Sequence, residues 1–139
     1  MQTTKYFTAI IILTLSLLLS GCADKSKLLV NTWMVENLKY TRQVPAEMQP
    51  QIDRAIAEMR QTFRLTYNAD GTYKTQSGTQ MLTGKWKLNW NSSTITSTTD
   101  KGEQKDYKIL ELNASKLSFK ATEGSDEVIF EMVPAKIIL

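Results

Sequence analysis

Few residues in this chain could do chemistry, and most of the common catalytic groups are missing. The 139 residues include one cysteine, Cys22, and no histidine. The thiolate of Cys22 could act as a nucleophile or a metal ligand. Because the chain has no histidine, a Ser-His-Asp triad, a Cys-His pair and a histidine-based zinc site are all excluded. Carboxylate pairs such as Asp126-Glu127 lie in polar, turn-like stretches, where solvated surface charge explains them better than general acid–base catalysis. We therefore expect that the protein is not an enzyme and binds neither a metal ion nor a cofactor.

Cys22 ends an apolar N-terminal stretch with a recognisable layout. Lys5 supplies a positive charge, residues 6–19 carry none, and Ser20 and Gly21 precede the cysteine. A charged start, an apolar centre and small residues before a cut are typical of a secretory signal peptide. As a helix the apolar run would extend about 21 Å, against a hydrocarbon core of roughly 30 Å. A permanent transmembrane helix is therefore the weaker interpretation.

The stretch Leu19-Ser20-Gly21-Cys22 resembles the lipobox of bacterial lipoproteins, in which an aliphatic residue, a small residue and Gly or Ala precede the cysteine. The resemblance implies cleavage before Cys22, thioether diacylation of its sulfur and a third acyl chain on the new amine. Two or more acyl chains form a stable membrane anchor. We therefore expect a signal peptide over residues 1–21, a lipidated tether over 22–27 and anchoring in the bacterial cell envelope, at the outer membrane. The alternative is an unmodified thiol in an ordinary signal peptide.

The part of the chain after residue 21 is expected to be one domain. It has 118 residues, enough to bury a core of its own. With its only cysteine assigned to lipid, this domain has no disulfide and depends on that core. The whole chain carries a net charge of +3, and basic residues alternate with acidic ones, as in residues 101–106. This pattern indicates a solvated surface rather than a nucleic-acid-binding stripe.

One amphipathic helix is expected after a first strand over residues 27–41. The apolar residues of that strand change face along its length, and a bulge near Glu36-Asn37 would reconcile the two halves. Beyond Pro50, the apolar residues fall on one face of a helix; they are Ile52, Ala55, Ile56, Met59 and Phe63. This helix either covers an open end or flank of a sheet, or forms a lid over a cavity. In the second case the adaptable lining would be Met48, Ile52 and Met59.

From Phe63 onward, apolar and polar residues alternate with the period of β-strands. The alternation is cleanest over residues 82–90, and turn-forming stretches such as residues 68–71 separate the runs. One strand precedes the helix and seven short strands follow it. We therefore predict a mainly β fold, an eight-stranded antiparallel meander barrel over residues 28–139 with one inserted helix.

The strand expected over residues 106–112 has apolar residues on both faces. Because side chains alternate along a strand, Tyr107 and Ile109 are expected on one face and Leu110 and Leu112 on the other.

Several motifs occur in a recognisable order along the predicted barrel. They are Asn31-Thr32-Trp33, residues 63–73, Gly84-Lys85-Trp86-Lys87-Leu88, residues 107–112 and Leu117-Ser118-Phe119. In this order and spacing they resemble the lipocalin-like lipoproteins common in Bacteroidetes-type bacteria. Asn31 stands where that family has Gly, and the helix over residues 50–62 is an insertion relative to a plain meander. The resemblance implies a small β-barrel and, for most members, no known ligand.

Two functions fit such a barrel, because eight strands enclose either packed side chains or one small ligand. In the first hypothesis, the barrel binds a small apolar ligand inside or at its mouth, lined by Leu65, Tyr67, Tyr73, Trp86, Leu88, Trp90, Tyr107, Ile109, Phe119 and Phe130. Trp90, nearest a strand end, is the expected mouth contact, whereas Trp33 and Trp86 are the expected core plugs. In the second, a filled barrel is an envelope accessory protein that binds another protein through an exposed apolar patch.

Overall fold

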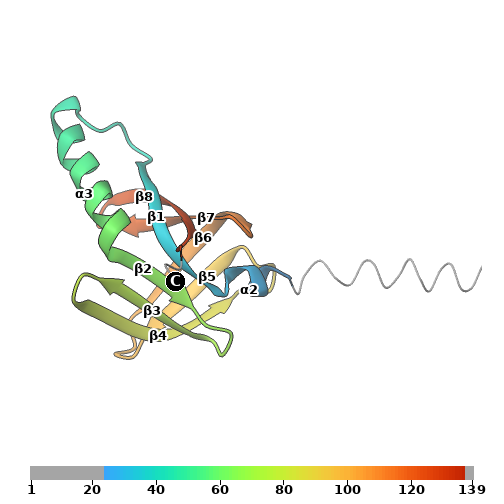
Figure 1. Cartoon of the computed structure of the whole chain (residues 1–139). Coiled ribbons are helices and arrows are strands. Elements are labelled where there is room, and N and C mark those ends of the chain that lie inside the picture. Colours follow the sequence, from blue (N-terminus) through green and yellow to red (C-terminus); the bar gives the residue numbers. More distant parts are fainter. Residues whose placement is uncertain (1–23, 137–139) are drawn as a thin grey trace, which may run out of the picture.

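Eight antiparallel strands close into a barrel in which each strand pairs with its sequence neighbours and β8 pairs with β1 (Figure 1). The strands are β1 (Asn31–Tyr40), β2 (Phe63–Tyr67), β3 (Thr72–Ser77), β4 (Gln80–Leu88), β5 (Thr94–Thr99), β6 (Gln104–Asn113), β7 (Lys116–Glu123) and β8 (Asp126–Pro134). The helical segments are α2 (Asp24–Leu29), the 3-10 helix η1 (Ala46–Met48) and α3 (Gln49–Thr62). The predicted mainly β, eight-stranded meander with a helix after its first strand is confirmed.

This computed structural model describes residues 24–136. The expected signal peptide and the expected lipid attachment at Cys22 lie outside the described residues. Within residues 24–136, no helix has the length and apolar character needed to cross a bilayer.

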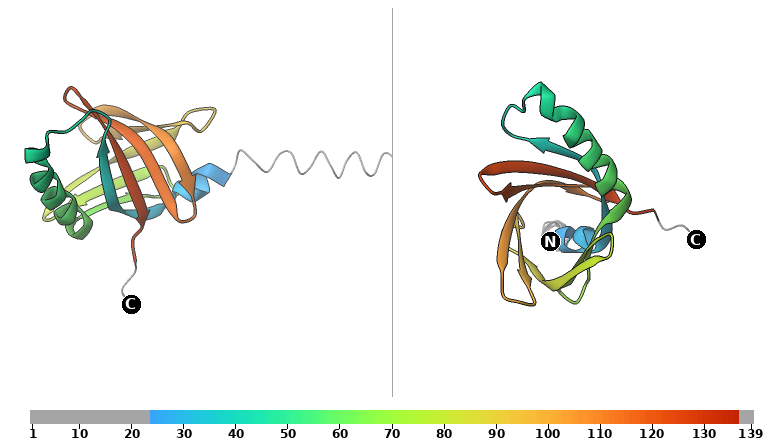
Figure 2. Two further views of the ribbon diagram at one scale, coloured as in Figure 1. Left: turned by 90° about the horizontal axis from the view of Figure 1, so that it is seen from above. Right: turned by 90° about the vertical axis from the view of Figure 1, so that its left-hand side faces the viewer.

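The two ends of the barrel differ. At the α2 end lie helix α2 and the turns 68–71, 89–93 and 113–115. At the α3 end lie helix α3 and the turns 78–79, 100–103 and 124–125. The two views show α2 at the end of the barrel, within the outline of the ring of strands, and α3 outside the ring along the flank (Figure 2).

Helix α2 closes its end of the barrel. Leu29 and Trp33 are both 0% exposed, and the Trp33 indole nitrogen donates a hydrogen bond to the Leu29 carbonyl at 3.0 Å. The prediction of a strand beginning at residue 27 is wrong, because residues 24–29 are helical and β1 begins at Asn31. The two leucines that resemble the start of a strand in the sequence instead end a helix, which carries Leu29 into the core.

Two bulges correct the direction of side chains along the strands. In β1 the register shifts between Val35 and Asn37, which confirms the bulge predicted there. An unpredicted shift lies in β6 between Ile109 and Glu111. It leaves Leu110 46% exposed and returns Leu112 to the interior, so the prediction that these two leucines share a face is wrong.

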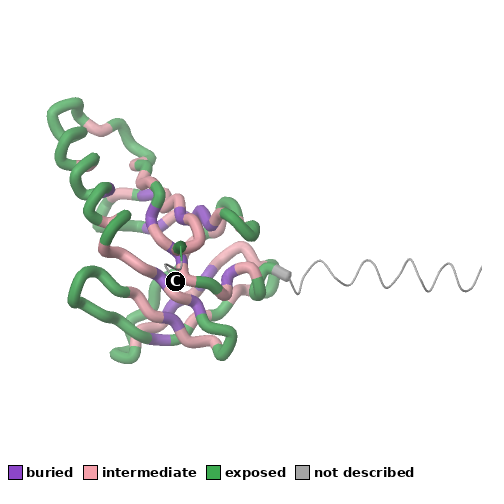
Figure 3. Tube along the Cα trace, viewed as in Figure 1, coloured by how far each residue is buried: buried purple, intermediate pink, exposed green. Residues whose placement is uncertain are grey.

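Helix α3 packs against the outside of the barrel beside β1. Pro50 lies in its first turn, and its one buried residue is Ile56. The Arg60 side chain donates to the Glu36 carbonyl at 2.7 Å, next to the β1 bulge. Ala55, predicted on the apolar face, is exposed. Figure 3 shows this long exposed stretch of α3 and the concentration of buried residues in the barrel. The helix therefore covers a flank of the sheet, one of its two predicted roles.

Candidate functional site

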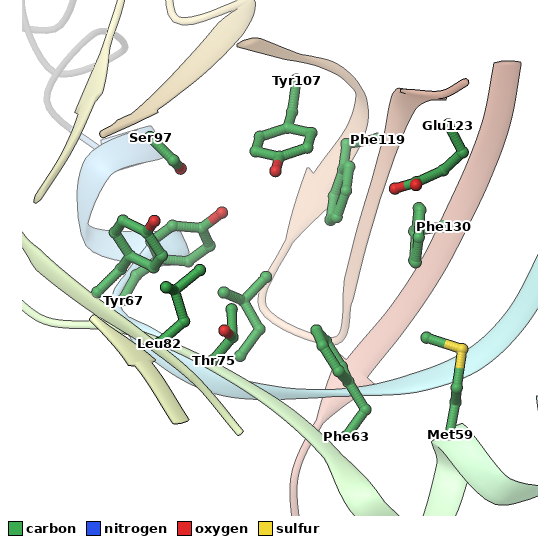
Figure 4. Close-up of a pocket in the computed structure, with 12 residues that line it drawn as sticks. Met59, Phe63, Tyr67, Thr75, Leu82, Ser97, Tyr107, Phe119, Glu123 and Phe130 are labelled. Carbon is green, nitrogen blue, oxygen red and sulfur yellow. The ribbon is translucent and has the colours of Figure 1, made fainter. Parts of the chain in front are cut away.

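The interior of the barrel contains a cavity of about 280 Å³ toward the α3 end (Figure 4). Its lining residues are Met59, Phe63, Leu65, Tyr67, Tyr73, Thr75, Leu82, Ser97, Tyr107, Phe119, Glu123 and Phe130. Most of these side chains are apolar or aromatic, which is the usual character of a small-molecule site. Met59 comes from α3 and the others come from β2 to β8, so every strand except β1 contributes to the site.

Six of the ten predicted ligand-binding residues line this cavity: Leu65, Tyr67, Tyr73, Tyr107, Phe119 and Phe130. Three more of the predicted residues pack against the core but do not line the cavity: Trp86, Leu88 and Ile109. Trp86 donates from its indole nitrogen to the Asn68 carbonyl at 3.0 Å, at the α2 end. Of the three residues suggested as a helical lid, only Met59 lines the cavity.

Trp90 lies apart from the cavity. It lies in the turn 89–93 at the α2 end, 94% exposed, whereas the cavity lies toward the α3 end. Trp90 therefore does not line this cavity, and its contact with a ligand stays a prediction. The sequence places Trp90 near the end of a strand. It does not show at which end of the barrel that strand ends, because successive turns of a meander lie at opposite ends.

Two small polar side chains line the cavity together with the aromatic rings. Thr75 and Ser97 point inward on β3 and β5, in the same phase as Tyr73 and Ile95. Both side chains are smaller than the aromatic residues of β6 to β8 that line the same cavity, so they fill less of the barrel interior. Sequence reasoning from large apolar residues missed both positions. Strand phase was the available signal, because residues two apart share a face.

Three aromatic rings form one wall of the cavity. Phe119 and Phe130 are stacked, with ring centroids 5.2 Å apart and planes 13° apart. Tyr107 meets Phe119 edge to face, with centroids 5.2 Å apart. These arrangements are the favourable ones for aromatic pairs and add about 0.5–1.5 kcal/mol each beyond area burial. The wall is therefore a rigid apolar surface against which a ligand could pack.

The polar groups of the cavity are mainly hydroxyls. Figure 4 shows those of Tyr107 and Ser97, with the Glu123 carboxylate, directed into the space between the rings. Burial raises the pKa of Tyr107 to about 12, with the charges of Tyr73 and Glu123 adding to the rise. Burial likewise raises the pKa of Tyr67. These hydroxyls therefore remain protonated at neutral pH and can donate hydrogen bonds. Within residues 24–136, no group of His, Cys, Asp or Glu side chains is placed to hold a metal ion.

A closed eight-stranded meander with an apolar cavity at one end defines a small lipocalin-like barrel. The family model described as "Lipocalin-like domain" matches residues 29–119, and the chain belongs to this family. It is also similar to the crystal structure of a DUF4847 family protein from Bacteroides vulgatus, with a TM-score of 0.56 and 14% sequence identity, over 81% of this chain and 98% of that one. At that identity the likeness shows the fold alone. No curated protein matches this sequence.

Proposed function

We propose that this protein is a non-catalytic, lipid-anchored barrel of the bacterial cell envelope that binds a small apolar ligand in the cavity at its α3 end. The cavity carries the proposal. Its volume of about 280 Å³ exceeds the roughly 150 Å³ that holds a benzene molecule and lies just below the range of drug-sized pockets. A ligand of one or two fused rings, or a short branched hydrocarbon, fits this space.

The chemistry of the lining supports binding rather than catalysis. A general base needs a pKa near the working pH, whereas burial raises the pKa of Tyr67, Tyr73 and Tyr107. The hydroxyls are better suited to donate hydrogen bonds to a single oxygen on an otherwise apolar ligand. The support for a lipid anchor in the cell envelope is the N-terminal sequence, from the charge at Lys5 to the lipobox-like residues before Cys22.

The binding proposal is tested by filling the cavity. Thr75→Phe places a ring in the cavity from β3, and Gln76→Phe places the same ring on the exposed outer face of the neighbouring position. The protein from residue 23 onward is titrated with N-phenyl-1-naphthylamine, a neutral apolar probe whose fluorescence rises in apolar surroundings. We expect saturable binding by the wild type and Gln76→Phe, and at least a tenfold weaker affinity for Thr75→Phe. Equal binding by both variants contradicts the proposal.

Native mass spectrometry of the same purified proteins provides a second readout. A small bound mass present in the wild type and absent from Thr75→Phe would identify the ligand. A clean unliganded mass together with no probe binding would favour the alternative, an envelope accessory protein that binds another protein. The anchor is tested separately on the full chain expressed in a bacterial host. We expect the mass of the mature protein to show an N-terminus at Cys22 carrying acyl chains, and Cys22→Ser to abolish them.

A further inference from the structure

We infer that the α2 end of the barrel is seated on the surface of the anchoring membrane, with Trp90 in the headgroup layer and the cavity opening away from the bilayer. This inference rests on the proposed lipid anchor at Cys22. It assigns a partner, the lipid surface, to a face that contains the most exposed large hydrophobic residue among the described residues.

The length of the connection forces the barrel close to the membrane. Only Ala23 lies between Cys22 and the first residue of α2, Asp24. Two residue steps span at most about 7 Å. The helix itself is held to the barrel, because its last residue, Leu29, is buried and its carbonyl accepts a hydrogen bond from Trp33. Acyl chains on Cys22 therefore bring the α2 end to the headgroups.

Trp90 lies at this same end. Its turn, residues 89–93, projects beyond the barrel on the side where α2 enters (Figure 2), and its side chain is 94% exposed. An indole ring exposed to water has no apolar partner. At a membrane interface its flat ring can lie against the acyl chains while its single N–H stays hydrated. A tryptophan on a turn beside a lipid anchor is in position to use that preference.

The distribution of charge supports the same orientation. The turns 68–71, 89–93 and 113–115 contain one charged residue, Asp70, and its carboxylate already accepts hydrogen bonds from the Thr72 backbone and hydroxyl. At the α3 end, the turn 100–103 alone contains three charged residues. Lys25 and Lys27 are exposed on α2, where they can meet lipid phosphates. Among the turns at the α2 end, Asp70 is therefore the only charged residue that would lose hydration against a membrane.

The orientation has a consequence for ligand exchange. The cavity opens at the far end of the barrel, toward the aqueous compartment, and a ligand enters from there rather than sideways from the anchoring bilayer. A reporter at that end is available in Met81, which is 60% exposed near the start of β4. Met81 and Trp90 are separated by about 20 Å along the barrel axis, given the rise and tilt of barrel strands.

The test uses the full lipidated chain in vesicles of phosphatidylethanolamine and phosphatidylglycerol, with and without brominated acyl chains that quench tryptophan on contact. Three proteins are compared: the wild type, Trp90→Phe, and Trp90→Phe with Met81→Trp. We expect bromolipid to quench the wild type, Trp90→Phe to lose more than half of that quenching, and the Met81→Trp reporter not to restore it. Flotation of the vesicles in a density gradient shows independently that each protein is anchored.

Every outcome decides the inference. Anchored Trp90→Phe protein that is quenched as strongly as the wild type, or a quenched Met81→Trp reporter, overturns the orientation while the lipid anchor stands. Failure of the wild type to float removes the anchor, and the inference with it. Neither result affects binding of the apolar probe in the cavity, which is measured on the protein from residue 23 onward.

Discussion

Replacing Trp33 by Phe is the sharpest test of how the barrel is closed. The change removes the hydrogen bond to the Leu29 carbonyl, which joins α2 to β1 at 3.0 Å. A buried carbonyl left without its donor costs about 1–3 kcal/mol. The smaller phenyl ring also leaves a void at a position that is 0% exposed, and filling or collapsing that void adds about 1–2 kcal/mol. We expect Trp33→Phe to lower the free energy of unfolding by roughly 2–5 kcal/mol.

The measurement is urea and thermal unfolding of the protein from residue 23 onward, followed by circular dichroism. For a domain of this size, the loss corresponds to a fall in Tm of about 10 °C. Trp90→Phe is the matched control in the same chain, because Trp90 is 94% exposed. Surface substitutions of this kind change stability by less than about 0.5 kcal/mol.

A second variant tests the contribution of helix α2 separately from that of strand β1. Leu29→Ala removes buried volume from the α2 side of the contact with Trp33. It is expected to lower the free energy of unfolding by about 2–5 kcal/mol. Because Leu29 and Trp33 are in contact, the double variant should lose less than the sum of the two single variants. If Trp33→Phe and Trp90→Phe are equally stable, α2 does not close the barrel, and the fixed connection used to orient it on the membrane fails too.

Two further predictions concern the packing against Tyr73 and the buried tyrosine hydroxyls. Gly84→Ala should destabilise the fold by about 1–3 kcal/mol, because a Cβ there would lie 2.7 Å from the Tyr73 ring and would also collide with the Thr98 carbonyl; a denaturation midpoint equal to the wild type would contradict this. Burial raises the pKa of Tyr107 to about 12 and that of Tyr67 as well, so the folded state holds protons that the unfolded state releases near pH 10. The stability that these tyrosines contribute should therefore be constant below about pH 10 and be lost between pH 10 and 12. Urea midpoints measured across this range check the fall, which should be smaller in Tyr107→Phe.

Most of the fold could be predicted from the sequence, because strand pairing in a meander is local. Residues 82–90 alternate strictly between apolar and polar residues, and β4 occupies Gln80–Leu88. The bulge at Glu36-Asn37 was predictable for the same reason, since the apolar positions change face there. Where one face of a strand is buried and the other wet, the pattern of side chains determines the register.

Other features depend on contacts that a linear pattern does not record. The bulge in β6 inserts a residue at Leu110, and the sequence around it, Ile109-Leu110-Glu111-Leu112, looks like a strand with two apolar faces. Helix α2 is six residues long, too short to show helical periodicity, and its stability comes from packing into the barrel. Both features were decided by tertiary packing rather than by local propensity.

The cavity shows why a list of large apolar residues predicts a lining but not an opening. Large side chains occur along the whole barrel, and at the α2 end they fill it: Trp33, Ile95, Leu117 and Met132 are all 0% exposed. Toward the α3 end the inward positions include Thr75 and Ser97, and there the rings of Tyr107, Phe119 and Phe130 face open space. Empty volume is set by the smallest inward residues, because protein interiors otherwise pack to near-crystal density. The barrel therefore has a filled half beside the proposed anchor and an open half away from it. A few small side chains account for this division, and the alternation of side chains along each strand identifies them.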